Sequence, residues 1–364
     1  MKKLLLHILL CLLGIACQQA SPGVELPDAE LYFPTTEEWQ RHSSYLEQSK
    51  TKDLRKFLEE NNTRAFIILK DGKILMEEYF NKDLLGAEYG EKSVWYWASA
   101  GKTLTAFTVG LAQENGFLDI NQKTSAYLGK SWTALTEDKE SLITVKHQLT
   151  MTTGLDVSVS DSHCFEPLCL QYKADAGTRW EYHNGPYTIL DHVISAATQS
   201  DFDNYFNQNL RDKIGMDGFW RYVNNDHVYF STARAMARFG LLMLNKGDWQ
   251  GEEVMRDKGY LNDMVNTSQN LNEAYGYLWW LNGKSTGMVP TLQTVFKREL
   301  TPNGPGDMFS GMGKNGQLVS VIPSEGLVIV RMGDSPDSSQ ISIDFMNEMF
   351  GKIGEIIAFG GGSD

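Results

Sequence analysis

Ser99 and Lys102 stand three positions apart, a spacing at which a lysine amine can assist a serine hydroxyl as nucleophile. The apolar positions that follow at helical intervals are Leu104, Phe107, Leu111 and Ala112. We therefore expect Ser99 at the N-terminus of a helix that Gly116 ends, with Lys102 one turn further on the same face. Free backbone N–H groups and the helix dipole at that end would stabilise an oxyanion.

A lysine accepts a proton at neutral pH only if its pKa falls well below the usual value of about 10.4. Burial and a neighbouring cation both lower a lysine pKa. A role for Lys102 as a base therefore predicts a buried amine with a second cation close to it.

Short motifs of this kind recur along the chain, so their order and their flanking segments decide which copies matter. A second Ser-x-x-Lys match at residues 49–52 lies inside a polar helical pattern. A Tyr-x-Asn motif at residues 182–184 lies in a turn-rich run before an apolar helical pattern. Lys-Asn-Gly at residues 314–316 directly precedes a predicted strand, where small residues let a substrate lie along the strand edge.

Ser-x-x-Lys, Tyr-x-Asn and a third motif of the Lys-Thr-Gly type, in this order, resemble the signature of the penicillin-recognising serine hydrolases. The Tyr form of the second motif is similar to that of the class C β-lactamase-like branch. Residues 149–155 and 232–240 resemble segments of the same branch. Residues 275–280 and 316–317 are more similar to the amide- and ester-hydrolysing members, such as 6-aminohexanoate-dimer hydrolase. The resemblance covers roughly residues 60 to 355.

The resemblance implies a role for each motif residue. Ser99 would be the nucleophile, and Lys102 would accept or shuttle its proton. Tyr182 would be the partner base and then the acid for the leaving group. Asn184 would orient Lys102 and the substrate, and Lys314 would supply the second cation.

The third motif would also form the strand edge of the site. Asn315 and Gly316 would border the substrate, and the backbone N–H groups of Ser99 and Gln317 would form the oxyanion hole. Asn315 departs from the family pattern, in which this position is Thr. Many relatives have no lysine where Lys314 stands, so the resemblance supports Lys314 less than it supports Ser99.

Three further positions depart from the family pattern. Thr152 stands where His is common and Ala235 where Asp is common, and both are expected to be structural. His183 lies between the two motif residues at 182 and 184, where small residues are frequent. We expect a partly exposed loop histidine there rather than a catalytic one.

Two apolar hairpins, one near each end of the chain, predict a single buried antiparallel sheet. Residues 65–69 and 74–76 flank Asp71-Gly72, a strong two-residue turn signal. The second hairpin is predicted over residues 318–322 and 327–330. Both carry many β-branched residues, as strands covered on both faces do.

Helical patterns over residues 36–61 and 340–358 flank these hairpins. A sheet built from both chain ends, with a mainly helical segment inserted between them, predicts two lobes with a cleft. The resemblance implies the α+β fold of β-lactamases and transpeptidases. The predicted hydrolase domain spans residues 36–358 and comprises a sheet lobe (36–98 and 290–358) and a helical lobe (99–289), with a loose tail at 359–364.

Residues 1–17 have the form of a secretory signal peptide, with a basic start, a short apolar run and small residues before Cys17. The segment also resembles a bacterial lipobox, in which Cys17 would carry a lipid; the alternative is cleavage near Ala16 or Ala20 without lipid. Residues 18–35 read as a tether. We expect an exported lipoprotein, facing the periplasm or the cell surface of a bacterium and held to the membrane by its lipid.

The composition indicates which disulfide, cofactors and partners to expect. Cys164 and Cys169 are the pair left for a disulfide in an exported protein, and two unpaired thiols are the alternative. The seven His residues show no metal-ligand spacing, so no metal and no other cofactor is expected. A net charge of −13 argues against nucleic acid as a partner. The nine Trp residues are expected mainly in the core.

Two classes of function fit these observations. The first is a serine hydrolase that acylates Ser99 with a small-molecule or peptide substrate and cleaves an ester, amide, peptide or β-lactam bond. The second is a membrane-tethered binding protein that keeps the fold without turnover. The joint presence of Ser99, Lys102 and Tyr182 favours the enzyme.

Overall fold

The computed structural model describes residues 31–35, 38–44, 46–339 and 341–359. The predicted signal peptide, the lipidation site at Cys17 and most of the predicted tether lie outside the described residues. No helix within the described ranges is long and apolar enough to cross a membrane.

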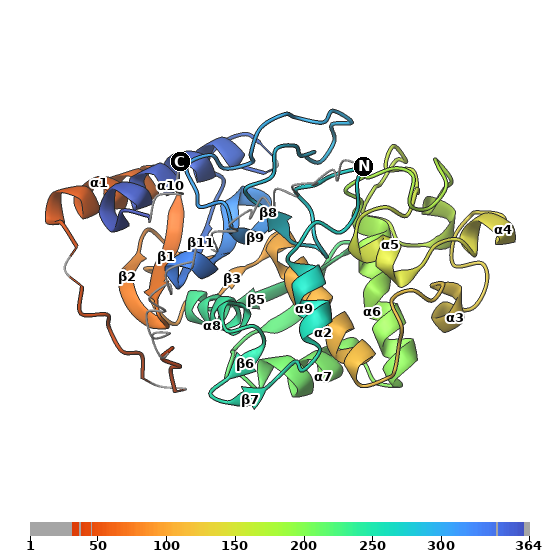
Figure 1. Ribbon diagram of the computed structural model, residues 1–364, viewed down its shortest axis with the longest axis horizontal. Coiled ribbons are helices and arrows are strands. Elements are labelled where there is room, and N and C mark those ends of the chain that lie inside the picture. The colour runs from red at the N-terminus through yellow and green to blue at the C-terminus, as the bar shows by residue number, and fades with distance from the viewer. Residues whose placement is uncertain (1–30, 36–37, 45, 340, 360–364) are drawn as a thin grey trace, which may run out of the picture. The chain divides into compact units, whose positions relative to one another are not determined.

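A six-stranded antiparallel sheet, built from both ends of the described chain, organises the fold (Figure 1). The strand order is β2-β1-β11-β10-β9-β8, so the two predicted hairpins meet where β1 pairs with β11. The α+β architecture expected from the sequence is confirmed. The strands are β1 (Thr63–Lys70), β2 (Lys73–Tyr79), β8 (Trp280–Leu281), β9 (Phe309–Gly313), β10 (Gln317–Ile322) and β11 (Leu327–Gly333).

The first hairpin turns as its Asp-Gly pair predicts. Lys70 pairs with Lys73 across the turn, and Asp71 and Gly72 both have positive φ, 49° and 79°. Asp and Gly are among the residues that tolerate this left-handed region. Asp71 also donates its backbone N–H to the carbonyl of Gly326, in the turn of the second hairpin, at 2.8 Å. The two turns therefore fasten each other at one end of the sheet.

Helices cover both faces of the sheet, which explains why β9, β10 and β11 are buried throughout. The helices α1 (Gln48–Glu60) and α10 (Ile343–Ile357) lie side by side, and Phe57 stacks on Phe345 with ring centroids 5.3 Å apart (Figure 1). The helix α8 (Ala233–Leu244) contacts β1, β10 and β11. A Cβ added at Gly240 would lie 2.4 Å from a Val328 methyl, so this glycine permits the close approach.

The predicted helix over residues 36–61 is too long at its N-terminal end. The structure starts α1 at Gln48, and the chain before it runs extended along β2. Ile74 donates to the carbonyl of Gln40, and His42 donates to the carbonyl of Ile74. Pairing with an open sheet edge satisfies the backbone groups there, so tertiary contact overrides the helical pattern.

Residues 31–35, which were expected at the end of a free tether, pack against the domain. The Phe33 ring contacts Trp249 with centroids 4.9 Å apart, and buried Arg238 donates to the carbonyls of Pro34 and Thr35. Phe33, Pro34 and Thr35 are therefore part of the packed domain and not of a free tether.

The segment inserted between β2 and β8 is mainly helical, as expected. Its longer helices are α2 (Lys102–Glu114) and α6 (Asn184–Thr198), and a small sheet has the order β3-β5-β4. The main sheet resumes at Trp280, earlier than the expected boundary at residue 290. The other elements of the segment are α3 (Ser125–Leu128), α4 (Glu137–Glu140), α5 (Val145–Leu149), α7 (Phe202–Phe206), α9 (Lys258–Met264), β3 (Trp95–Tyr96), β4 (Phe219–Val223), β5 (Asp226–Ser231), β6 (Asp248–Trp249) and β7 (Glu252–Glu253).

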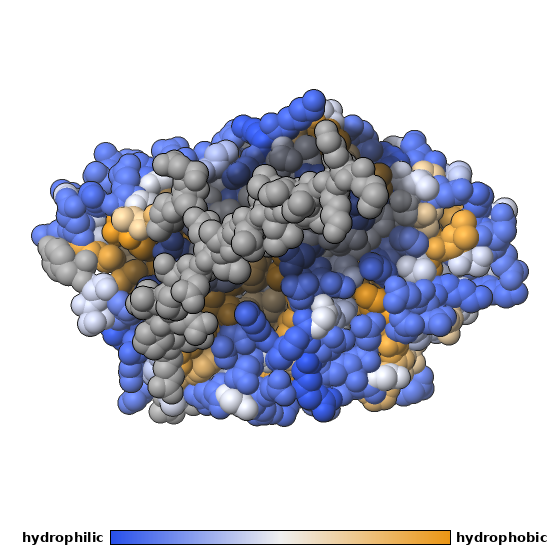
Figure 2. Space-filling model, in the orientation of Figure 1, coloured by the Kyte–Doolittle hydropathy of each residue, from blue (hydrophilic) through white to orange (hydrophobic). Residues whose placement is uncertain are grey.

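The core is rich in aromatic rings, and eight of the nine tryptophans are buried, as the composition predicted. Trp39 is the partly buried exception. On the face shown in Figure 2, hydrophilic residues predominate and apolar residues form small groups between them.

Arg331 on β11 is the most heavily hydrogen-bonded buried side chain of the sheet. Its guanidinium donates to the carbonyls of Asn315 and Gly316 in the β9–β10 turn at 2.7 and 3.0 Å. It also donates to Asn61, just after α1, at 2.8 Å, and to Asp334 at 3.0 Å. Its Nε reaches the Thr63 hydroxyl, at 3.2 Å. One side chain thus joins the N-terminal helix, the first strand and the turn that leads out of β9.

Replacement of Arg331 by methionine should lower the free energy of unfolding by about 3 to 5 kcal/mol, because several buried acceptors lose their donors together. Urea denaturation followed by circular dichroism measures this change. The matched control is Arg298→Met, since Arg298 is 65% exposed and 3.9 Å from its acidic partner. The control should change stability by less than about 0.5 kcal/mol. Equal effects of the two substitutions would contradict the assignment.

Candidate active site

Ser99 lies in η1 (Ala98–Gly101), a single 3-10 turn that runs directly into α2. The preceding residue, Ala98, has φ of 47°, an unfavourable conformation for a residue with a Cβ. The segment is held because the buried Trp97 donates its backbone N–H to Tyr229 at 2.8 Å and its indole N–H to Ser231 at 2.7 Å. The small sheet therefore fixes the turn that presents Ser99, whose side chain remains partly exposed.

Lys102, the first residue of α2, is only 4% exposed. Its Nζ lies 3.6 Å from the centroid of the Tyr187 ring and 5.6 Å from that of Tyr182. Burial lowers the pKa of Lys102 to about 8, against the opposing charges of Asp226 and Asp191. About a tenth of this amine is therefore neutral at pH 7, far more than for an ordinary lysine, and the neutral form is the one that acts as a base.

The second cation expected at Lys314 is not among the charges that act on Lys102, while a role of Lys314 in substrate binding stays a prediction. Lys314 is exposed, in the turn η4 (Lys314–Gly316) that joins β9 to β10. The two charges that act on Lys102 are carboxylates, and both raise its pKa. Desolvation alone accounts for the lowered proton affinity of the amine.

The Ser99 side chain lies beside the Tyr182 phenol and lowers the pKa of that phenol, against the effect of burial. Its ring stacks on Trp280 of β8, with centroids 5.9 Å apart and an angle of 18° between the planes. Burial raises the pKa of Tyr182 well above its ordinary value, and the charge of Asp226 adds to this. The phenol therefore stays protonated at neutral pH unless a neighbouring base takes its proton.

Asn184, the first residue of α6, lies beside two residues that the motifs did not indicate. Its Nδ2 is 3.2 Å from Nδ1 and 3.3 Å from Nε2 of His163. His163 in turn contacts the Asp226 carboxylate at 2.7 Å, and this contact raises the pKa of His163. His163 and Asp226 are 63 positions apart, so no local pattern could have joined them.

Directly after His163, a disulfide between Cys164 and Cys169, with an S–S distance of 2.01 Å, closes a short loop. Next to it, Gly185 donates its backbone N–H to the carbonyl of Ser162 at 3.0 Å. A Cβ at Gly185 would lie 2.4 Å from the Cys164 carbonyl, so the glycine lets this loop approach the start of α6. The loop and α6 together position Asn184 and His163.

Strand β9 borders Ser99, and Gly313 is its point of closest approach. A Cβ at Gly313 would lie 2.5 Å from the Trp97 carbonyl and 3.0 Å from the backbone nitrogen of Ser99. The oxyanion partner expected at Gln317 belongs instead to β10, where Gln317 pairs with Gly313 across the hairpin. The Gln317 side chain bonds both backbone groups of Gly333, at 2.6 and 3.0 Å. The side chain of Gln317 therefore has a structural role, and the oxyanion-hole role expected of its backbone N–H stays a prediction.

The other two residues of the third motif shape the β9–β10 turn. Asn315 has φ of 64° and donates its side-chain amide to the Tyr96 hydroxyl at 2.7 Å. Gly316 has φ of 70°, and a Cβ there would lie 2.7 Å from a guanidinium nitrogen of Arg331. The positive φ angles of Asn315 and Gly316 and the hydrogen bonds from Arg331 therefore shape this turn.

His183 corrects another expectation, since it is 1% exposed rather than partly exposed. Burial lowers the pKa of His183 to about 4, so the ring is neutral at neutral pH. The Thr152 hydroxyl forms a hydrogen bond with the Thr150 hydroxyl at 2.7 Å, and Ala235 is buried in α8. Both observations agree with the structural roles expected of these two residues.

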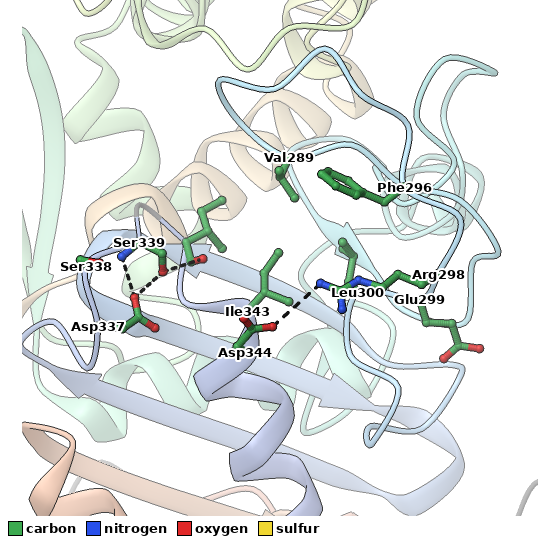
Figure 3. A pocket seen from close by; sticks show the side chains of 11 residues that line it. Val289, Phe296, Arg298, Glu299, Leu300, Asp337, Ser338, Ser339, Ile343 and Asp344 are labelled. Carbon is green, nitrogen blue, oxygen red and sulfur yellow. Dashed lines mark hydrogen bonds and ion pairs between the residues drawn. The ribbon is translucent and has the colours of Figure 1, made fainter.

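The described residues form no metal-binding group, and the cavity near α10 lies away from the candidate site. Within the described ranges, no group of three or more His, Cys, Asp or Glu side chains could hold a metal ion. A separate cavity of about 430 Å³ lies near the start of α10, and Figure 3 shows Arg298 and Asp344 pointing toward each other at its edge. None of Ser99, Lys102 and Tyr182 lines this cavity.

Comparison with known proteins identifies the family of this chain. The family model described as beta-lactamase matches residues 54–341. No curated protein sequence matches the chain.

Solved structures share the fold at low sequence identity. A Bacillus anthracis protein with the provisional name 6-aminohexanoate-dimer hydrolase has a TM-score of 0.66 and 19% identity, covering 90% of this chain and 88% of its own. A penicillin-binding protein from Bacillus halodurans has a TM-score of 0.60 and 16% identity, with coverages of 81% and 98%. A family VIII carboxylesterase has a TM-score of 0.65 and 14% identity, with coverages of 86% and 98%. Because the family model matches most of its length, this chain belongs to the beta-lactamase family.

Proposed function

We propose that the protein is a serine hydrolase that forms an acyl-enzyme on Ser99. The observation that carries the proposal is that the Ser99 side chain lies beside the Tyr182 phenol and close to the buried amine of Lys102. This arrangement has a nucleophile, a base whose pKa lies near neutrality, and a protonated phenol that can pass a proton onward.

In the first half of the reaction, the Ser99 oxygen attacks the carbonyl carbon of the substrate. The hydroxyl proton passes to Lys102, directly or through Tyr182, and the developing oxyanion lies at the N-terminus of η1 and α2. Collapse of the tetrahedral intermediate breaks the bond to the leaving group, which takes a proton from Tyr182. Water then attacks the acyl group, gives up a proton to the same residues, and restores the Ser99 hydroxyl.

The substrate that we propose is a small molecule or peptide with an ester, amide, peptide or β-lactam bond. The names of the structural neighbours, a carboxylesterase and a 6-aminohexanoate-dimer hydrolase, support esters and amides as the first to test. Gly313 lies where β9 meets Ser99, so the substrate that we propose would lie extended beside this end of β9.

Ser99→Ala should abolish labelling of the protein by a fluorophosphonate and turnover of a short-chain nitrophenyl ester, while the circular dichroism spectrum stays unchanged. The matched control is Ser49→Ala, which alters the other Ser-x-x-Lys match, on α1, and should keep full activity. A chromogenic cephalosporin tested beside the ester reports whether lactams are substrates. Labelling that persists in Ser99→Ala would contradict the proposal, and absence of labelling in the wild type would favour a binding protein.

Tyr182→Phe should lower kcat/KM for the ester by 10²- to 10⁴-fold, the usual effect of losing an acid–base group. Tyr275→Phe is the control, because Tyr275 packs against Tyr182 and its buried hydroxyl has no hydrogen-bond partner among the described residues. That variant should stay within about twofold of the wild type, since no paired hydroxyl is lost. Near-normal rates in Tyr182→Phe would remove Tyr182 from the mechanism.

We also propose that the protein is exported and lipidated at Cys17, facing the periplasm or the cell surface. The disulfide between Cys164 and Cys169 supports an oxidising compartment. In a bacterial host, the full chain should fractionate with membranes, and Cys17→Ser should release it. Cys11→Ser, which changes the other N-terminal cysteine, should leave the membrane fraction unchanged. Equal fractionation of both variants with membranes would argue against lipidation.

A further inference from the structure

Two adjacent residues at the start of β5, Asp226 and His227, each form a histidine–aspartate pair with a residue from elsewhere in the chain; these are called the two reciprocal pairs below. Asp226 contacts Nδ1 of His163, directly before the disulfide-closed loop, at 2.7 Å. Its neighbour His227 contacts the carboxylate of Asp191, on α6, at 2.8 Å through Nδ1. Side chains alternate across a strand, so the two pairs lie on opposite sides of β5. One strand thus supplies an aspartate to one pair and a histidine to the other.

The pair formed by Asp191 and His227 is deeply buried. Asp191 is 3% exposed and His227 is 9% exposed. Only one carboxylate oxygen of Asp191 is bonded to His227, and the other is buried without a hydrogen-bond partner among the described residues. A half-satisfied buried carboxylate is costly for stability, so its presence calls for a functional reason.

The position of Asp191 connects it with the amine of the active site. Asp191 lies one helical turn beyond Tyr187 on α6 and therefore on the same face. The ring of Tyr187 contacts Lys102 Nζ at 3.6 Å, and its hydroxyl bonds Thr105 of α2 at 3.0 Å. The packing of α2 against α6 thus keeps Asp191 and Lys102 in one buried region, where charges are weakly screened.

The groups that face this region come from several elements. Lys102 is bordered by Tyr182 and Tyr187 and is acted on by the charges of Asp226 and Asp191. His163 responds in turn to the charge of Lys102. The charge of His192, the next residue on α6, also acts on Asp191 and lowers its pKa. On the outer side, Asp203 of α7 lies 3.5 Å from Nε2 of His227, across a cavity of about 280 Å³ that both residues line.

We propose that the two reciprocal pairs, Asp226–His163 and Asp191–His227, set the pH at which Lys102 becomes a base. They are positioning residues, because they act on the proton of Lys102 and do not touch the reacting atoms. The inference deepens the proposed function and rests on it.

The sign of the effect follows from the charges. Each carboxylate favours the protonated amine, so removing either one should lower the proton affinity of Lys102 and leave it neutral to lower pH. A proton gained by His163 cancels part of the same negative field. As the pH falls, protonation of His163 would therefore reduce the effect of Asp226 on Lys102, and acylation would persist further into mild acid than with an unpaired Asp226 carboxylate.

The test is the pH dependence of fluorophosphonate labelling of Ser99 between pH 5 and 9. Asp191→Asn and Asp226→Asn should each move the acidic limb of the labelling rate to lower pH, by about one unit for a close charge. The Asp226 shift should be the larger, because the charge of Asp226 acts on Lys102 more strongly than that of Asp191. Asp203→Asn is the matched control: it removes a carboxylate from the same neighbourhood and should leave the limb in place.

A limb that stays at the wild-type pH in both variants, or that moves to higher pH, would overturn the inference while leaving Ser99 as the nucleophile. A merely structural role would lower the rate at every pH without moving the limb, and this result would overturn it too. Where Asp191→Asn fails to fold, the partly exposed Asp226→Asn decides the question. Loss of Ser99-dependent labelling in the wild type itself would overturn the proposed function and this inference together.

Discussion

Burial of a single amine beneath the nucleophile is the constraint on which the candidate site depends. Lys102 is 4% exposed at the start of α2, where it meets the rings of Tyr182 and Tyr187. Burial in such surroundings disfavours the charged form, and the two carboxylates that act on Lys102 oppose that effect. The resulting pKa of about 8 is a balance between the two. The elements around α2 can be understood as the parts that keep water out and the carboxylates in place.

Those parts come from distant segments, and each is fixed by a local device. The backbone of Trp97 is tied to the small sheet, which sets the turn that presents Ser99. Gly185 lets the disulfide-closed loop reach α6, and Gly313 lets β9 reach Ser99. At both glycines a Cβ would lie 2.5 Å or less from a carbonyl oxygen, so the geometry tolerates no side chain there. Precision at the site thus rests on backbone packing as much as on the functional side chains.

The sequence was sufficient for features with a local signal and failed where the signal is tertiary. Ser99 and Lys102 could be found because an apolar helical pattern follows them, and the hairpin at Asp71 could be found from its turn. The strand that borders Ser99, residues 309–313, was missed because its glycines and its methionine lack a strand pattern; the neighbouring strands and α2 bury it. Lys314 was accordingly assigned to the site, although it lies beyond the end of that strand in an exposed turn.

The histidine–aspartate pairs were equally invisible in the sequence. His163 and Asp226 meet only because the loop and β5 are brought together by folding, and the same holds for Asp191 and His227. The expected helix before residue 48 failed for a related reason, since contact with the edge of β2 at Ile74 outweighs the helical periodicity. Non-local pairing, not weak local propensity, accounts for these differences.

Two buried cations in this fold show how hydrogen bonding separates a structural charge from a reactive one. The guanidinium of Arg331 is surrounded by oxygen acceptors from four segments, and at neutral pH it stays charged even though burial lowers its pKa to about 9. The amine of Lys102 has aromatic faces as its close neighbours instead, and no hydrogen-bond acceptor for it is found among the described residues. Acceptors hold a proton in place, whereas ring faces stabilise charge without binding the proton. The first arrangement anchors the turn beyond Gly313; the second leaves a proton free to move.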